Sequence, residues 1–477
     1  MTAPAGPAGS APTADIEVDV RQPSDQRPVA SPAPVREPEK AAAAATPDRR
    51  LALARHIVPI LNRALPRNGG LTVELAEPGS GVPVMGSGAP RSRAIVRDPD
   101  ALGRLLSPPV PDTFGEAYVR GDLEIEGDVR SAIQAADAID LRRLGPTDAR
   151  RAARWGFELA QASGRPTAAG RVAALTGKRH SPARDMAAIR SHYDVGNDFY
   201  ALWLDHRMTY LCAYFASHDQ PLDAAQDAKL ELICRKLDLR TGQRLLDIGC
   251  GWGSLINYAA DRHGVDAVGV TLSEQQASLA NARADAIGLG DRSRAEVLDY
   301  RAAATLGEFD AVASVGMFEH VGRANLAAYF AAAYGVVKPG GLFLSHGIAS
   351  GRGRAAFSER LQPGTSHFVE RHVFPDGELL PIEETIRVAR AAGFEVLDVQ
   401  SLQPHYALTL AAWVKALELN WTKAVARSND ELARTWRLYM SAARLGFERG
   451  ELDVFQVLFA RPLDKQRPAP RALRPWW

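Results

Sequence analysis

The chain has 477 residues, of which 46% are hydrophobic and 24% are charged, and its formal net charge is +1 at pH 7. Single cores seldom grow beyond about 300 residues, so this length indicates more than one folded unit, and the near-zero charge argues against a nucleic-acid partner. Three cysteines are too few for a disulfide framework or a zinc cluster, and neither a signal peptide nor an apolar run of about 18 residues occurs, so we expect a cytoplasmic protein without a metal site.

The first 141 residues are predicted to hold a disordered tail and a small domain. Residues 1–48 are rich in Ala, Pro, Gly, Ser and Thr, so they cannot bury enough apolar surface to offset the entropy of ordering. Helical spacing at 51–65 and a strand, turn and helix pattern at 94–106 then predict a small α+β domain over residues 49–141.

Residues 142–180 are predicted to be a basic linker. Between Arg142 and Arg179 the sequence has nine Arg or Lys residues against Asp148 and Glu158. This excess of positive charge favours contact with an anionic surface such as a membrane. The alternative is a solvated helical connector that binds nothing.

Residues 181–477 are predicted to form a larger α/β domain, because apolar strands alternate there with helical patterns. The expected strands are RLLDIGC, DAVGVTL, FDAVASV, GLFLSHG and FEVLDVQSL, followed by FQVLFARP as a last edge strand. Strands separated by stretches long enough for a crossover helix predict a doubly wound, mostly parallel sheet with helices on both faces.

A glycine loop follows the first of these strands. Gly249, Gly251 and Gly253 precede a helical stretch, which is the context of a nucleotide-binding loop. The loop lacks the full G-x-G-x-x-G spacing that seats a pyrophosphate, so S-adenosylmethionine, which has no phosphates, is favoured over a dinucleotide. A loop that only turns a strand into a helix is the remaining alternative.

Seven collinear blocks make the chain resemble the cyclopropane-fatty-acyl-phospholipid synthases and the mycolic acid cyclopropane synthases. They are HYDVGNDFYALWLD, MTYLCAYF, LLDIGCGWGSL, GVTLSEQQ, SVGMFEHVG, FVERHVFPDGELLP and QPHYALTLAAW. The resemblance implies a Rossmann-like class I methyltransferase fold over residues 181–477. The weaker likeness of GEAYVRGDLEIEGD at 115–128 extends it to the small domain, for which it implies a lipid-related role.

The same resemblance implies the site residues. Those expected to bind S-adenosylmethionine are Tyr210, Leu211, Gly249, Cys250, Gly251, Thr271, Leu272, Ser273, Glu274, Gln275, Gln276, Asp299 and Tyr300. Those expected to grip a catalytic bicarbonate ion are Cys212, Glu319, His346, Ile348 and Tyr406. Each also has a plainer interpretation: Cys212 as a small buried hydrophobe, Glu319 as a surface acid, His346 as a core histidine, and Tyr406, like Trp413, as a core aromatic residue.

The implied reaction transfers the methyl carbon of S-adenosylmethionine to the cis double bond of an acyl chain in an unsaturated phospholipid. It leaves a carbocation, and bound bicarbonate then removes a proton so that a cyclopropane ring closes. The second alternative has the same fold and substrate class but forms a methylene or methyl branched fatty acid, the methylene branch arising by loss of a different proton. A non-catalytic lipid-binding protein is the third alternative. A substrate in a bilayer implies peripheral contact with the membrane surface, and a homodimer is left open.

Overall fold

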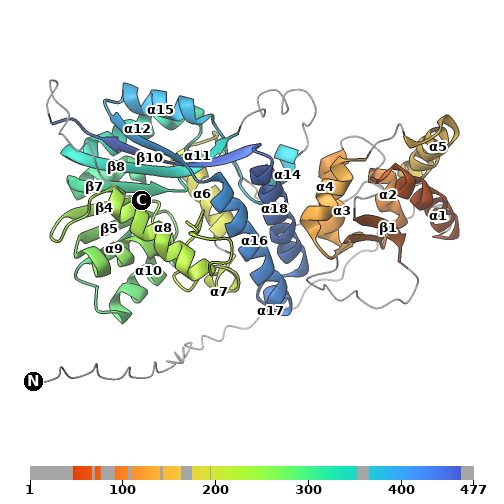
Figure 1. The fold of residues 1–477 in the computed structure, drawn as a ribbon, viewed down its shortest axis with the longest axis horizontal. Coiled ribbons are helices and arrows are strands. Elements are labelled where there is room, and N and C mark those ends of the chain that lie inside the picture. The colour runs from red at the N-terminus through yellow and green to blue at the C-terminus, as the bar shows by residue number, and fades with distance from the viewer. Residues whose placement is uncertain are drawn as a thin grey trace, which may run out of the picture. The chain divides into compact units, whose positions relative to one another are not determined.

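The structure is a computed structural model, and it describes residues 47–66, 70–76, 92–105, 110–139, 143–162, 175–193, 195–351 and 365–463 (Figure 1). The predicted disordered tail at 1–48 lies outside these residues except for Pro47 and Asp48, which begin helix α1 (Pro47–Ala64). Within the described residues, no helix combines the length and the apolar composition that crossing a bilayer requires.

The small domain contains a three-stranded sheet with the strand order β1-β2-β3. Its strands are β1 (Leu71–Leu75), β2 (Ser92–Val96) and β3 (Leu123–Glu126), and its helices before residue 141 are α1, α2 (Pro99–Leu105), α3 (Val110–Arg120) and α4 (Val129–Asp137). Strand β2 pairs parallel to β1 and antiparallel to β3, and its apolar residues share a core with Ile57 of α1 and Leu102 of α2. The predicted α+β character of this region is confirmed.

Helix α5 (Pro146–Ala162) occupies much of the region predicted to be a linker. Its residues Ala152, Trp155 and Leu159 recur at helical spacing and pack into the cores of the small domain, with Leu159 fully buried. The arginines that dominate the composition of the helix lie on its other side, so a count of charges does not reveal its apolar face. The small domain therefore extends beyond the predicted boundary at residue 141.

The larger domain is built on a seven-stranded sheet with the order β6-β5-β4-β7-β8-β10-β9. Its strands are β4 (Arg244–Ile248), β5 (Asp266–Thr271), β6 (Ser293–Val297), β7 (Phe309–Val315), β8 (Val337–Ser350), β9 (Glu395–Ser401) and β10 (Leu452–Ala460). All pairs from β6 to β8 are parallel, whereas β10 runs antiparallel to both of its neighbours. The prediction of a doubly wound, mostly parallel sheet is confirmed.

The prediction that 455–462 forms an edge strand is wrong, because β10 lies between β8 and β9. Four consecutive residues of β10, from Gln456 to Phe459, are buried, so both faces of this strand are covered. Strand β9 alternates between half-buried and exposed positions, which is the pattern of a sheet edge.

Helices cover both faces of the large sheet (Figure 1). One face carries α8 (Leu222–Lys236), α9 (Ser254–His263) and α10 (Glu274–Ala286), and the other carries α12 (Leu326–Val336) and α15 (Ile382–Ala391). A third apolar core, rich in aromatic rings, surrounds α16 (Gln403–Leu419) and α18 (Asp430–Glu448), which pack against each other. This third core positions the walls of the site described below.

Helix α18 also fixes the small domain to the larger one. Its Arg434 forms a buried ion pair of 2.6 Å with Glu124, and its Arg437 donates hydrogen bonds to the Tyr118 hydroxyl at 3.0 Å and to the Gly127 carbonyl at 2.8 Å. Loss of one partner from a buried ion pair is strongly destabilising, so these bonds specify one arrangement of the small domain on the larger one. Removing either guanidinium would leave its buried polar partners without a hydrogen bond.

Candidate active site

The backbone of the glycine loop adopts conformations that residues other than glycine would adopt only with strain. Gly249, Gly251 and Gly253 have φ angles of 83°, 53° and 79°, in the region that L-residues rarely adopt. The amides of Gly249 and Cys250 both donate to the Val270 carbonyl, at 2.9 and 3.0 Å, so β5 holds the loop in place. A Cβ on Gly253 would lie 2.7 Å from the Cβ of Ala280, which shows how closely α10 approaches the loop.

A cavity of about 2030 Å³ opens at the carboxyl ends of β4, β5 and β7, next to this loop. Open parallel sheets bind their ligands at this edge. The predicted cofactor residues that line the cavity are Tyr210, Leu211, Gly249, Cys250, Gly251, Thr271, Leu272, Gln276, Asp299 and Tyr300. The structure therefore brings together residues that are up to 90 positions apart in the chain.

Ser273, Glu274 and Gln275 are not among the residues that line the cavity. The Ser273 hydroxyl caps α10 by accepting a hydrogen bond from the Gln276 amide at 3.3 Å. The Glu274 side chain is exposed and pairs with Arg190 at 3.3 Å, and Gln275 is exposed as well. Their contact with the cofactor stays a prediction from the resemblance, whereas a structural role for Ser273 is visible.

Tyr210 and Leu211 lie on a strained loop against the aromatic core. Leu211 has a φ angle of 76°, an uncommon conformation for a residue with a side chain. The ring of Tyr210 stacks on Trp413 with a centroid distance of 5.2 Å, and its buried hydroxyl has no hydrogen-bond partner in the ranges that the structure describes. Trp413, whose role the sequence left undecided, is a core residue that supports the cavity wall.

Glu319 lies on the short helix α11 (Phe318–Val321), directly after β7, and is only 6% exposed. Its carboxylate borders the cavity beside Gly347, where a Cβ would lie 2.7 Å from Oε2, and Oε2 has no hydrogen-bond partner among the residues that the structure describes. Burial raises the pKa of Glu319 to about 7, although hydrogen bonding to its own backbone and to that of Ile348 lowers it in part. The interpretation of Glu319 as a surface acid is therefore wrong.

The other residues predicted to grip the anion divide into two groups. Ile348 and Tyr406 line the cavity with Glu319, whereas Cys212 and His346 are fully buried and do not line it. Burial raises the pKa of the Cys212 thiol, so this group stays protonated, and its Sγ lies 3.2 Å from the Ala213 carbonyl. Cys212 thus behaves as a small buried side chain in this structure.

His346 lies on β8 behind the cavity wall. Its Nδ1 is 3.4 Å from Nε2 of the buried Gln456, and its own Nε2 has no hydrogen-bond partner in the described part of the chain. Burial, with the positive charges of Lys229 and Lys236, lowers its pKa well below the usual value, so the ring is neutral. If Gln456 donates to Nδ1, the ring proton is on Nε2, which lies behind the residues that line the cavity.

Two charged residues of the cavity, Asp247 just before the glycine loop and Lys229, were not among the predicted site residues. Asp247 and Lys229 both line the cavity, and burial raises the pKa of Asp247 to about 7 and lowers that of Lys229 to about 8. Oδ1 of Asp247 has no hydrogen-bond partner among the described residues. A signal was present for Lys229, since it and Lys236 occupy the buried face of α8 at helical spacing, where lysine is seldom found without a partner.

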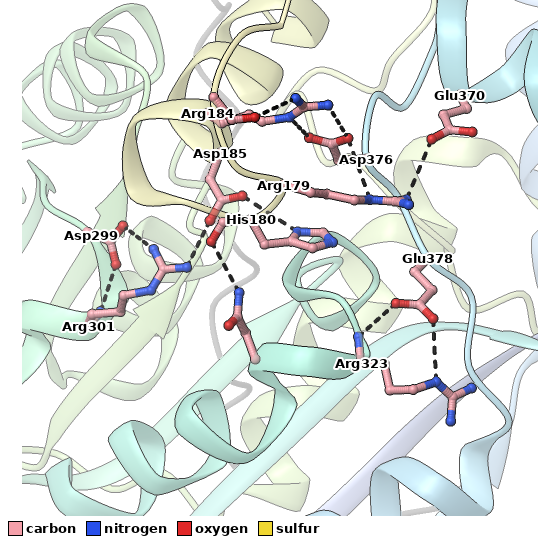
Figure 2. A network of polar contacts seen from close by, with 12 residues as sticks. Arg179, His180, Arg184, Asp185, Asp299, Arg301, Arg323, Glu370, Asp376 and Glu378 are labelled. Atoms are coloured by element: carbon pink, nitrogen blue, oxygen red, sulfur yellow. Dashed lines mark hydrogen bonds and ion pairs between the residues drawn. The ribbon is translucent and has the colours of Figure 1, made fainter.

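A polar network holds α6 (Pro182–Tyr193) against the cofactor end of the cavity (Figure 2). Arg301 lies between two carboxylates, at 2.8 Å from Asp185 of α6 and 2.8 Å from Asp299. Arg184 of the same helix forms two bonds of 2.6 and 2.9 Å with Asp376. Helix α6 is thereby connected to the predicted cofactor residue Asp299 on one side and to the loop that contains Asp376 on the other.

We expect Arg301→Gln to weaken S-adenosylmethionine binding about 10-fold, because it removes charge-assisted hydrogen bonds that orient Asp299 and α6. Titration calorimetry with the purified protein measures this change. Arg294→Gln is the matched control, since Arg294 forms ion pairs on the exposed part of β6 away from the cavity. An unchanged affinity in Arg301→Gln would show that the network is structural only.

Orphaned polar atoms in the cavity fit the predicted cofactor. The buried Asp247 Oδ1 and the hydroxyls of Tyr210 and Tyr300 all lack partners within the described residues. S-adenosylmethionine offers an amino group, a carboxylate and ribose and adenine donors that such atoms could bind. The residues present therefore suit this molecule, with the glycine loop on one side and Asp299 on the other.

Comparison with known proteins gives the family of the chain. The family model for mycolic acid cyclopropane synthetase matches residues 180–457. A probable fatty acid methyltransferase of Pseudomonas putida is 38% identical over 374 residues, which make up 78% of this chain and 88% of that protein. The cyclopropane-fatty-acyl-phospholipid synthase of Escherichia coli strain K12 is 34% identical over 275 residues, or 58% of this chain and 68% of that protein.

Solved structures agree with this result. The mycolic acid cyclopropane synthase CmaA1, complexed with SAH and CTAB, is 35% identical with a TM-score of 0.54, and the match covers 58% of this chain and 98% of that one. The predicted resemblance and fold are thus confirmed. The chain belongs to the mycolic acid cyclopropane synthetase family and is an S-adenosylmethionine-dependent methyltransferase.

Proposed function

We propose that this enzyme transfers the methyl carbon of S-adenosylmethionine to the cis double bond of an acyl chain in an unsaturated phospholipid, giving a cyclopropane fatty acid. The observation that carries this proposal is the position of Glu319, a buried carboxylate in the same cavity as the glycine loop, whose Oε2 has no hydrogen-bond partner among the described residues. The relative solved with SAH and CTAB, an amphiphile with one long alkyl chain, supports an acyl chain as the second ligand.

The residues of this chain would mainly position and desolvate the reactants. S-adenosylmethionine supplies an electrophilic methyl carbon, and an alkene is a weak nucleophile, so alignment in a dry cavity must provide much of the acceleration. Tyr406 and Tyr439 line the cavity beside Glu319, and burial raises the pKa of both hydroxyls. They therefore remain neutral, and the faces of their rings can stabilise a positive charge.

Bicarbonate would supply the base that removes the proton when the ring closes. Its proposed partners are Cys212, Glu319, His346, Ile348 and Tyr406. The free Oε2 of Glu319 can accept a hydrogen bond from a hydroxyl. Cys212 and His346 do not line the cavity, so their part in holding the anion rests on the family resemblance. The Ile348 backbone, which already stabilises the Glu319 carboxylate, borders the same place.

A methylene- or methyl-branched product is the second candidate, and one comparison favours it. The protein from Pseudomonas putida, named a probable fatty acid methyltransferase, matches 78% of this chain, whereas the Escherichia coli cyclopropane synthase matches 58%. The proton spectrum of lipids from a host that expresses the protein separates the two products. Upfield ring-proton signals support the cyclopropane, and vinylic or branched-methyl signals without them would replace it with the second candidate.

We propose further that the enzyme contacts the membrane surface through helix α5. Arg150, Arg151, Arg154 and Phe157 are exposed on this helix, with Phe157 64% exposed, so cationic groups flank an apolar anchor. Each cation near an anionic bilayer contributes to binding. A peripheral enzyme would thus reach its phospholipid without a membrane-spanning helix.

Replacing all three arginines of α5 with glutamine should weaken binding to anionic vesicles roughly 100-fold at low salt, because three attractions to lipid head groups are lost. Co-sedimentation with phosphatidylglycerol vesicles measures the change. Affinity for S-adenosylmethionine should stay the same, which controls for folding. Unchanged sedimentation and unchanged activity on vesicles would refute this membrane surface.

A further inference from the structure

The cavity at the glycine loop continues into the small domain. The same cavity is lined by Leu61 of α1, Val73 of β1, Ala94 of β2, Leu102 of α2 and Ile133 of α4, and we call this part the small-domain arm. Ala94 is 6% exposed and Leu102 is 1% exposed, so the arm borders the core of the domain, and it reaches the surface at the exposed end of α4. No role for this space follows from the methyl-transfer site itself.

The walls of the small-domain arm suit hydrocarbon. Among the described residues of the small domain that line it, only Gln134 and Asp137, near the end of α4, are polar, and Asp137 is paired with Arg449 at 2.7 Å. Protein cores are normally packed with few voids larger than a water molecule. An apolar space of this kind within a core is typical of a binding site for an apolar ligand.

One face of α18 joins the arm to the reaction site. Tyr439, Ala442, Ala443 and Gly446 recur at helical spacing and line the cavity between Tyr406 and the small domain. The buried bonds of Arg434 and Arg437, on the same helix, hold the small domain at this position. The two parts of the cavity are thus kept in a fixed relation by one rigid element.

We propose that the small-domain arm binds the second acyl chain of a diacyl lipid substrate, the chain that is not modified, while the unsaturated chain lies beside Glu319 and Tyr406. This inference rests on the proposed function and specifies that the lipid substrate has two acyl chains. A single compact ligand occupies a pocket of about 300–1,000 Å³. The cavity of about 2030 Å³ has room for the cofactor and for two chains.

Photo-crosslinking tests the location of the second chain without requiring turnover. Two phospholipids carry a diazirine at the methyl end of either the saturated or the unsaturated chain, and mass spectrometry maps the adducts on the wild-type protein. The probe on the saturated chain should label peptides that contain Val73, Ala94 or Ile133. Labelling of these peptides by the unsaturated chain alone, which would mean that the arm holds the far end of the reacting chain, or by neither probe, would overturn the proposal.

Filling the arm tests its contribution to turnover. Val73→Trp and Ile133→Trp change half-buried side chains, so folding should survive, and Ala52→Trp adds the same ring at an exposed position of α1. Both arm variants should reduce kcat/KM on diacyl vesicles about 10-fold and leave turnover of a monoacyl lysolipid unchanged, as Ala52→Trp should for both substrates. Equal losses on the two substrates, or no loss on either, would refute the role of the arm.

The failure of this inference differs from the failure of the proposed function. If the wild-type enzyme modifies neither diacyl nor monoacyl unsaturated lipid, the proposed function is wrong, and the crosslinking still decides whether the arm binds a chain. If the wild-type enzyme modifies both and the arm variants do not discriminate between them, only the assignment of the arm is wrong. Unchanged thermal midpoints and S-adenosylmethionine affinities confirm that the variants are folded.

Discussion

Glu319→Gln should reduce turnover of unsaturated phospholipid by about 10²–10⁴-fold, the range that a positioned acid–base group contributes. The amide has nearly the same shape as the carboxylate, but it cannot carry the negative charge that faces the cavity. Binding of S-adenosylmethionine should change little, because Glu319 is not among the predicted cofactor residues. Initial rates on vesicles and calorimetry on the same preparation measure the two quantities.

Glu308→Gln is the matched control for this variant, because Glu308 is exposed just before β7 and does not line the cavity. The pH profile adds a second readout. With a pKa of about 7, Glu319 is protonated below that pH and ionised above it, so kcat should rise as pH increases through 7 if the carboxylate accepts a hydrogen bond. A kcat that falls over the same interval would show that the protonated acid is the active form and would contradict the proposed role.

Gly251→Val should weaken S-adenosylmethionine binding by at least about 100-fold. Gly251 has a φ angle of 53°, so a side chain at this position would strain the loop. A Cβ at Gly251 would have no heavy atom of the described residues within 4 Å, so the new side chain would project into the open space beside the loop. A β-branched residue with a positive φ is a rare outlier that carries about 1–3 kcal/mol of strain. Calorimetry gives the affinity, and thermal unfolding gives the stability.

Gly288→Val separates the two effects, because Gly288 has a φ angle of 71° and equally open surroundings, but it lies in the turn after α10, away from the cavity. Both variants should lose stability to a similar extent, and only Gly251→Val should lose affinity. Equal affinities would mean that the loop does not contact the cofactor.

The sequence predicted the features of this protein that have a local cause. Alternation of apolar strands with helical stretches predicted the parallel sheet, and the glycines at 249, 251 and 253 predicted a loop whose φ angles the structure confirms as positive. The resemblance placed Glu319, Ile348 and Tyr406 in one site, and all three line the cavity. The sheet and the loop depend on residue type and spacing within short stretches, whereas the grouping of Glu319, Ile348 and Tyr406 depends on a resemblance between separate blocks of the chain and the family.

Features that depend on distant contacts were not predictable in the same way. Nothing in FQVLFARP shows that β10 inserts between β8 and β9, since an apolar strand reads the same at either position. The arginines of α5 masked its apolar face in a count of charges. The small-domain arm joins residues near position 73 to residues near position 446, and only the fold brings these together.

Incubation of the purified enzyme with unsaturated phospholipid vesicles and S-adenosylmethionine bearing an isotopically labelled methyl carbon tests the central claim most directly. We predict that the label appears in the acyl chain as a cyclopropane ring carbon between the former alkene carbons, and that Glu319→Gln, at equal S-adenosylmethionine occupancy, transfers far less of it. Absence of label from the acyl chains with the wild-type enzyme, or undiminished transfer by Glu319→Gln, would contradict the account.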